Sequence, residues 1–227
     1  ELLYFVLLIG PEPSMPKKKL LVVGGACFAS LVAFSLLFTW VVSSGMGPQK
    51  KLRVALSLLD EERWDVAGRI ARELGDQVDP DADATWQYVQ GVSKLQSVQL
   101  NIDSPKNRRT LIEATAHLVS AEKIGFPAGY QGKGQFYLGW CYFNTYQWEA
   151  AAKQLQGCEQ LWPQRRSDVF AMTIEAHLRK IPADTAAASV ALDAWAAIPG
   201  MSANETARIQ LSRAHVDFVE QNYASCE

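Results

Sequence analysis

Residues 132–165 read GKGQFYLGWCYFNTYQWEAAAKQLQGCEQLWPQR, and this stretch decides the fold class. Counted from Gly132, small residues stand at positions eight, twenty and twenty-seven, as Gly139, Ala151 and Cys158. Small side chains at these intervals let two antiparallel helices approach closely, and the larger residues between them fill the remaining space. The stretch therefore predicts a helical hairpin.

The chain beyond residue 49 carries looser versions of the same pattern. Loops with proline or glycine separate the helical segments, and no alternating pattern of β-branched residues continues for five positions. The sequence thus predicts an all-α body. Its repeating units are expected at about 50–80, 83–127, 132–165, 167–200 and 203–227. The last unit is incomplete, so we expect the natural chain to continue beyond residue 227.

The spacing in residues 132–165 resembles the tetratricopeptide repeat, whose unit has about 34 residues. Tyr142, Trp148 and Leu155 stand at further positions of the family pattern, whereas Gln135 replaces its usual first aromatic residue. The resemblance implies a helical-hairpin solenoid that winds into a right-handed superhelix. The whole chain is also similar to the large membrane-anchored tetratricopeptide proteins of planctomycete-type bacteria.

The resemblance further implies a binding groove, because the first helix of each repeat lines the concave face in this family. The groove positions carried onto this sequence are Lys133, Phe136, Trp140, Phe143, Asn144, Glu175, Leu178, Arg179, Arg213 and Asp217. Phe136, Trp140 and Phe143 recur at i, i+4 and i+7, so they form one stripe on a helix. Such a stripe suits a peptide or helix of a partner. It is also consistent with core covered by the next repeat, and the sequence leaves both interpretations open.

The N-terminal region predicts a membrane anchor. Residues 20–43 carry no charge and are long enough to cross a bilayer as one helix. Three lysines in the flank 15–19 favour a cytoplasmic N-terminus, which puts the repeats on the extracytoplasmic side of a bacterial inner membrane. Residues 44–49 read as a hinge, and residues 1–14 as a read-through or non-native leader. A cleaved signal peptide is the alternative to an uncleaved anchor.

Composition excludes several classes of function. A net charge of -2 gives no basic footprint for nucleic acid. Four cysteines without a CxxC pair, and three histidines without a ligand cluster, favour neither a metal site nor a disulfide framework. His177 and His215 stand at equivalent positions of successive units, but polar packing explains them better than a metal. Lys133 lies in a glycine-rich turn whose spacing does not fit a phosphate-binding loop.

These observations predict a protein without catalytic residues, cofactor or small-molecule substrate. The expected function is that of a membrane-anchored adaptor or scaffold, which binds a protein or peptide partner, or a second copy of itself, in the concave groove. An envelope chaperone or assembly factor is the first alternative. The second is the docking arm of a longer enzyme whose catalytic domain lies beyond residue 227.

Overall fold

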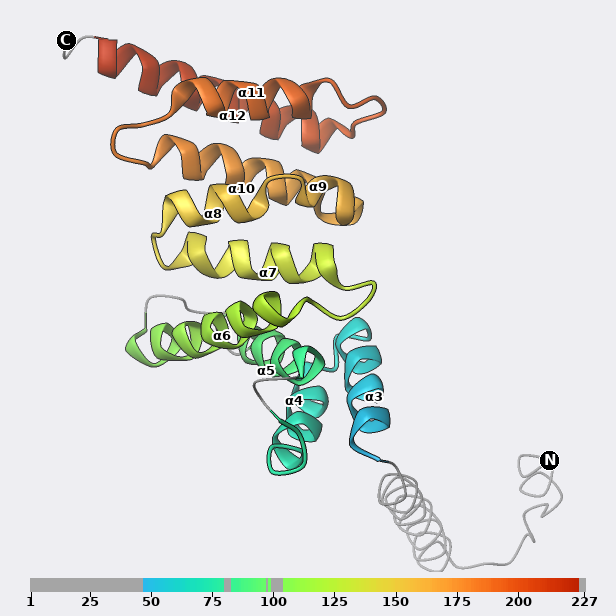
Figure 1. Ribbon diagram of the computed structural model, residues 1–227. Coiled ribbons are helices and arrows are strands. Elements are labelled where there is room, and N and C mark those ends of the chain that lie inside the picture. Colours follow the sequence, from blue (N-terminus) through green and yellow to red (C-terminus); the bar gives the residue numbers. More distant parts are fainter. Residues whose placement is uncertain (1–46, 80–82, 97, 99–103, 225–227) are drawn as a thin grey trace, which may run out of the picture. The chain divides into compact units, whose positions relative to one another are not determined.

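The computed structural model describes residues 47–79, 83–96, 98 and 104–224. The prediction of an all-α chain is confirmed for these residues, which contain helices and no strand (Figure 1). The α-helices are α3 (Pro48–Asp60), α4 (Trp64–Glu73), α5 (Ala84–Gln96), α6 (Pro105–Ile124), α7 (Gln131–Asn144), α8 (Trp148–Leu155), α9 (Cys158–Leu161), α10 (Arg166–Leu178), α11 (Thr185–Ala196) and α12 (Ala203–Ala224). A short 3-10 helix, η1 (Pro163–Arg165), precedes α10.

Each helix packs chiefly against its neighbours in the chain. Helix α5 packs against α4 and α6, α7 against α6 and α8, and α10 against α8 and α11. Figure 1 shows the chain reversing direction between α7 and α8 and again between α10 and α11. Packing also joins helices that are second neighbours, since α3 contacts α5 and α10 contacts α12.

Close approach of α7 and α8 depends on the small residues that the sequence pattern singled out. A methyl group added at Gly139 would lie 2.6 Å from the Leu155 side chain, so a larger residue would force Leu155 to shift. Ala151 and Cys158 are fully buried. Both Cys158 and Cys141 are free thiols and buried. The Cys158 thiol lies 3.2 Å from the carbonyl oxygen of Gly132. The expected close approach of the two helices is therefore confirmed.

The second helical segment of residues 132–165 differs from expectation, because it is broken. Helix α8 ends at Leu155, and Gln156 adopts an extended conformation. Gly157 follows in the left-handed region with φ 79°, a conformation that glycine adopts without steric cost, and the four-residue helix α9 then begins. The break redirects the chain so that α9 packs against α7.

Hydrogen bonds around Ser202 fix the start of α12. Ser202 precedes the helix, and its hydroxyl oxygen accepts a hydrogen bond from the Glu205 backbone N–H. The Glu205 carboxylate in turn accepts from the backbone N–H of Ser202, which makes a reciprocal capping box. The same carboxylate accepts from the Ser167 hydroxyl at 2.6 Å and faces Arg166, so the cap also ties α12 to α10.

The capping box predicts a pH dependence of stability. The hydrogen bond from Ser167, helped by those from Ser202, lowers the pKa of Glu205 from 4.5 to about 2. Because the folded-state pKa is depressed, this contribution is present above pH 4.5 and is lost as the pH falls towards 2. We expect Glu205→Gln to unfold at lower urea concentration than the wild type at pH 7. The difference should shrink steadily from pH 4.5 downwards.

Glu220→Gln is the control, since it removes an exposed carboxylate from the same helix. Urea midpoints of the three proteins across this pH range test the prediction. A difference in urea midpoint between the wild type and Glu205→Gln that stays constant across this pH range would contradict the prediction.

The core lies in clusters between successive helices. The largest joins α3 to α7 and contains Leu111, Leu118 and Leu138, all fully buried. Another lies between α10, α11 and α12, with Trp195 at its centre. The Trp195 ring is fully buried and stacks on Phe170, with 5.8 Å between the ring centroids.

No helix in the described part of the chain is both long and apolar enough to cross a membrane. The predicted span 20–43, its basic flank 15–19 and the leader 1–14 lie outside the described residues, as do residues 44–46 of the predicted hinge 44–49. Pro48 and Gln49 of that hinge belong to α3.

Candidate functional site

A cavity of about 250 Å³ forms beside α7, and we call it the α7 cavity. Its apolar wall consists of Trp64, Leu95, Phe136, Tyr137, Trp140 and Met172. Its polar side consists of Arg165, Asp168 and Arg208. Two of the predicted groove residues, Phe136 and Trp140, thus line a real hollow.

Aromatic contacts hold the apolar wall in place. Trp64, at the start of α4, meets Tyr137 edge to face with ring centroids 5.9 Å apart. Phe136 packs in the same way against Tyr137 and Trp162. Phe136 is only 6% exposed, so it builds the wall, whereas half-buried Trp140 offers surface to a ligand.

Tyr137 is the titratable residue of the apolar wall. Burial raises the pKa of Tyr137 to about 12, although Arg165 opposes the shift. The phenol therefore stays protonated at neutral pH.

The polar side is built from three elements. Arg165 of η1 donates to the Asp168 carboxylate at 3.1 Å, and Arg208 of α12 donates to its other oxygen at 3.2 Å. Aromatic rings lie under both guanidinium groups. Arg165 is 5.9 Å from the Phe136 centroid, and Arg208 is 5.7 Å from that of Trp195. The two cations are therefore held in place on the rim of the cavity.

Lys133 has a different role from the predicted one. Its ammonium group forms an ion pair with Asp60, at the end of α3, and lies 5.1 Å from the centroid of the Tyr130 ring. The Tyr130 hydroxyl donates to the same carboxylate at 2.7 Å. Lys133 thus ties the α3–α4 turn to α7 and does not line the α7 cavity.

The predicted aromatic stripe does not continue along α7. Phe143 packs edge to face against Trp148, over a cluster of buried alanines that includes Ala151. Asn144 donates from its amide to the carbonyl oxygen of Trp140 at 2.8 Å, so it serves the end of the helix. Of the predicted stripe, Phe136 and Trp140 thus share one hollow, whereas Phe143 makes its contacts elsewhere.

The remaining predicted groove residues also lie outside the α7 cavity. Arg179 donates to Glu175 and covers the Trp148 ring, at 5.3 Å from its centroid. Arg213 donates to Asp193 at 3.1 Å. Leu178 is buried in the core between α10 and α12, whereas Asp217 is exposed.

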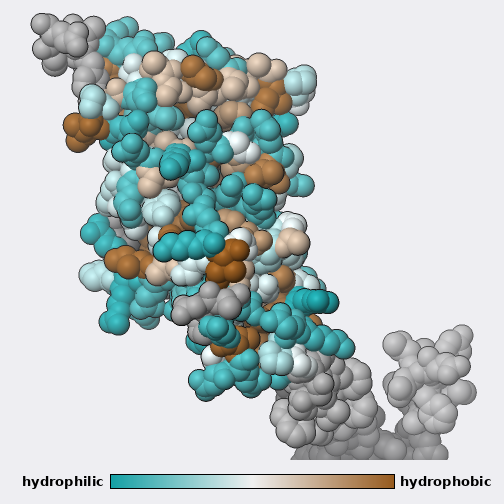
Figure 2. All heavy atoms as spheres, in the orientation of Figure 1, coloured by the Kyte–Doolittle hydropathy of each residue, from teal (hydrophilic) through white to brown (hydrophobic). Residues whose placement is uncertain are grey.

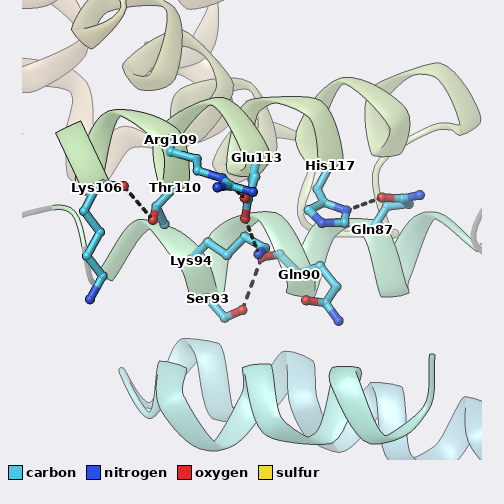
Figure 3. Close-up of polar contacts among 9 residues, drawn as sticks. All are labelled: Gln87, Gln90, Ser93, Lys94, Lys106, Arg109, Thr110, Glu113 and His117. Carbon is cyan, nitrogen blue, oxygen red and sulfur yellow. Dashed lines mark hydrogen bonds and ion pairs between the residues drawn. The ribbon is translucent and has the colours of Figure 1, made fainter.

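A polar seam between α5 and α6 was not foreseen from the sequence (Figure 3). The Glu113 carboxylate forms ion pairs with Lys94 of α5 and with Arg109 of its own helix. The hydrogen bond from Lys94 lowers the Glu113 pKa. His117 Nδ1 lies 2.7 Å from the side-chain oxygen of Gln87, and burial lowers the His117 pKa, so the imidazole is neutral at pH 7. Gln90 is 6% exposed, and its side chain points away from α6.

Two smaller hollows adjoin the α7 cavity and share Trp64 with it. One, of about 210 Å³ between α4 and α5, is lined by Gln90, Lys94 and Arg72 among others. The other, of about 100 Å³, lies at the α3–α4 turn and includes Asp60 and Tyr137. One indole therefore forms part of the wall of all three hollows.

A wider hollow of about 590 Å³ lies between α8, α10 and α11. Its floor is rich in alanine, as at Ala152, Ala187 and Ala191, and charged residues lie at the edge. Its lining includes the aromatic ring of Phe170 and the ammonium group of Lys180, which pairs with Asp184 at 3.2 Å, but not the group of several aromatic rings and two arginines found in the α7 cavity. Elsewhere on the face in view, apolar residues form small patches separated by hydrophilic ones (Figure 2).

Within the described ranges, no group of three or more potential metal ligands comes together. His177 and His215 each face a separate carboxylate, Asp184 at 3.6 Å and Glu175 at 3.2 Å. The two histidines therefore serve different contacts.

Comparisons with protein-family models, with curated proteins and with solved structures gave no match.

Proposed function

We propose that the chain is a membrane-anchored adaptor of tetratricopeptide-like hairpins, and that it binds a segment of a partner protein in the α7 cavity. The neighbour-to-neighbour packing of α3 to α12 supports a solenoid architecture. The uncharged segment 20–43 supports the anchor. In this proposal the repeats hold a partner near the bacterial inner membrane and carry out no chemistry of their own.

The observation that carries the proposal is the composition of the α7 cavity. Aromatic residues and arginine are enriched at the energetic centres of protein interfaces, and here they converge on one hollow. Its volume of about 250 Å³ is below the roughly 300–1,000 Å³ typical of small-molecule pockets. A cavity of this size suits one or two side chains of a bound segment better than a cofactor.

The proposal predicts that Trp140→Ala weakens partner binding more than Phe143→Ala does. Trp140 is half-buried, and truncating an aromatic residue at the centre of an interface costs about 2 kcal/mol or more of binding free energy. Phe143→Ala is the matched control, because Phe143 lies on the same helix with similar exposure but outside the α7 cavity. Tagged full-length chains would be crosslinked in cells and captured from membranes.

We expect a discrete partner to be captured by the wild type and by Phe143→Ala, and lost with Trp140→Ala. Equal capture by all three would contradict a binding role for the α7 cavity. A broad set of unfolded clients would instead favour a chaperone, and capture of the chain alone a homo-oligomer. Thermal unfolding of the purified variants shows whether a loss of capture reflects a loss of fold.

A further inference from the structure

The cations of the α7 cavity outnumber its anions. Asp168 is shared by Arg165 and Arg208, so the three groups together carry one positive charge. A guanidinium has five N–H donors, and each arginine directs one of them at Asp168. The Arg165 and Arg208 side chains are 52% and 38% exposed. Donors therefore remain available at the rim for a second carboxylate.

The two guanidinium groups are also preorganised. Arg165 rests against Phe136 and Trp162, and Arg208 rests against Trp195. Such contacts restrict the side chains before a ligand arrives, which reduces the entropy lost on binding. A planar guanidinium recognises a carboxylate through two parallel hydrogen bonds.

The apolar wall begins directly beside these cations, since both line the same hollow. Met172 and Trp140 belong to that wall, and Met172 adapts to side chains of different shape. An occupant that uses the whole cavity therefore carries a carboxylate at one end and an apolar side chain at the other.

From this arrangement we infer that the α7 cavity binds an acidic peptide segment. A side-chain carboxylate of an internal Asp or Glu bridges Arg165 and Arg208, and a neighbouring apolar or aromatic side chain enters against Trp140 and Met172. The inference rests on the proposed function, because it specifies the partner of the same cavity. Charge complementarity with the Arg165–Asp168–Arg208 group selects the acidic residue.

Selection from a random peptide library tests the inference. The library is displayed on phage without a free C-terminus, so that only side chains supply carboxylates, and it is selected on the full-length chain in detergent. We expect enriched sequences to share an Asp or Glu at a fixed distance from an apolar residue. Enrichment of apolar residues without an acidic one would overturn the inference and leave the proposed function standing. If the wild-type chain enriches no peptide more strongly than the Trp140→Ala protein does, the proposed function itself is overturned.

Titration of one selected peptide, with an amidated C-terminus, then tests the two cations. Arg208→Gln should weaken binding about tenfold or more, as expected for a lost charged hydrogen bond. Arg213→Gln is the matched control, since Arg213 lies on the same helix but pairs with Asp193 outside the cavity. Asp168→Asn should tighten binding, a gain that damage to the fold cannot produce. Equal affinity of all variants, or weaker binding by Asp168→Asn, would overturn the inference.

Discussion

Replacing Trp195 by alanine is expected to lower the free energy of unfolding by about 3–5 kcal/mol. The side chain is fully buried between α10 and α12, where its ring stacks on Phe170 at an interplanar angle of 10°. Truncation removes this contact and leaves a cavity that the neighbouring helices can fill only in part. It also removes the ring under Arg208, so binding in the α7 cavity should weaken as well. Urea unfolding followed by circular dichroism measures the effect on stability.

Trp195→Phe provides the comparison. The Trp195 indole N–H is buried without a hydrogen-bond partner in the described part of the chain, and phenylalanine removes that unsatisfied donor. We expect Trp195→Phe to cost clearly less than Trp195→Ala. Equal losses for the two variants would show that ring packing does not control stability at this position.

Replacing Gly132 by valine is expected to cost about 3 kcal/mol, at the upper end of the usual range for overpacking. A methyl group added at Gly132 would lie 2.7 Å from the carbonyl carbon of Leu161 and 2.8 Å from its oxygen. These are backbone atoms, so a rotamer change cannot relieve the overlap, and α9 has to move away from α7. The Gly132 carbonyl would then lose its contact with the Cys158 thiol.

Gly47→Ala is the control for this experiment, because a methyl group there would meet nothing within 4 Å. Urea midpoints of the two variants and the wild type are compared at pH 7. A Gly132→Val protein as stable as Gly47→Ala would contradict the close packing of α7 and α9.

Helical packing was predictable because it depends on local spacing. Gly139, Ala151 and Cys158 lie within one hairpin, and the intervals between them specify which faces of α7 and α8 meet. The break at Gly157 was not predicted, since a single glycine in a helical pattern is compatible with a continuous helix.

Most of the α7 cavity could not be predicted from the sequence pattern, which identified two of its nine lining residues. Phe136 and Trp140 were found because they lie four residues apart on one helix. Trp64, Arg165 and Arg208 come from three other elements, and only tertiary packing brings them together. Lys133 was placed in the groove by its position in the repeat, and its contact with Asp60 could not be predicted because the two residues lie 73 positions apart in the sequence.

Trp64 is a wall residue of all three adjoining hollows, so one substitution there alters all of them at once. The same ring is 9% exposed and packs edge to face against Tyr137, which itself lines two of the hollows. The cavity wall and the helix core therefore share side chains, and a change at Trp64 that alters the α7 cavity is expected to lower the stability of the surrounding helices as well.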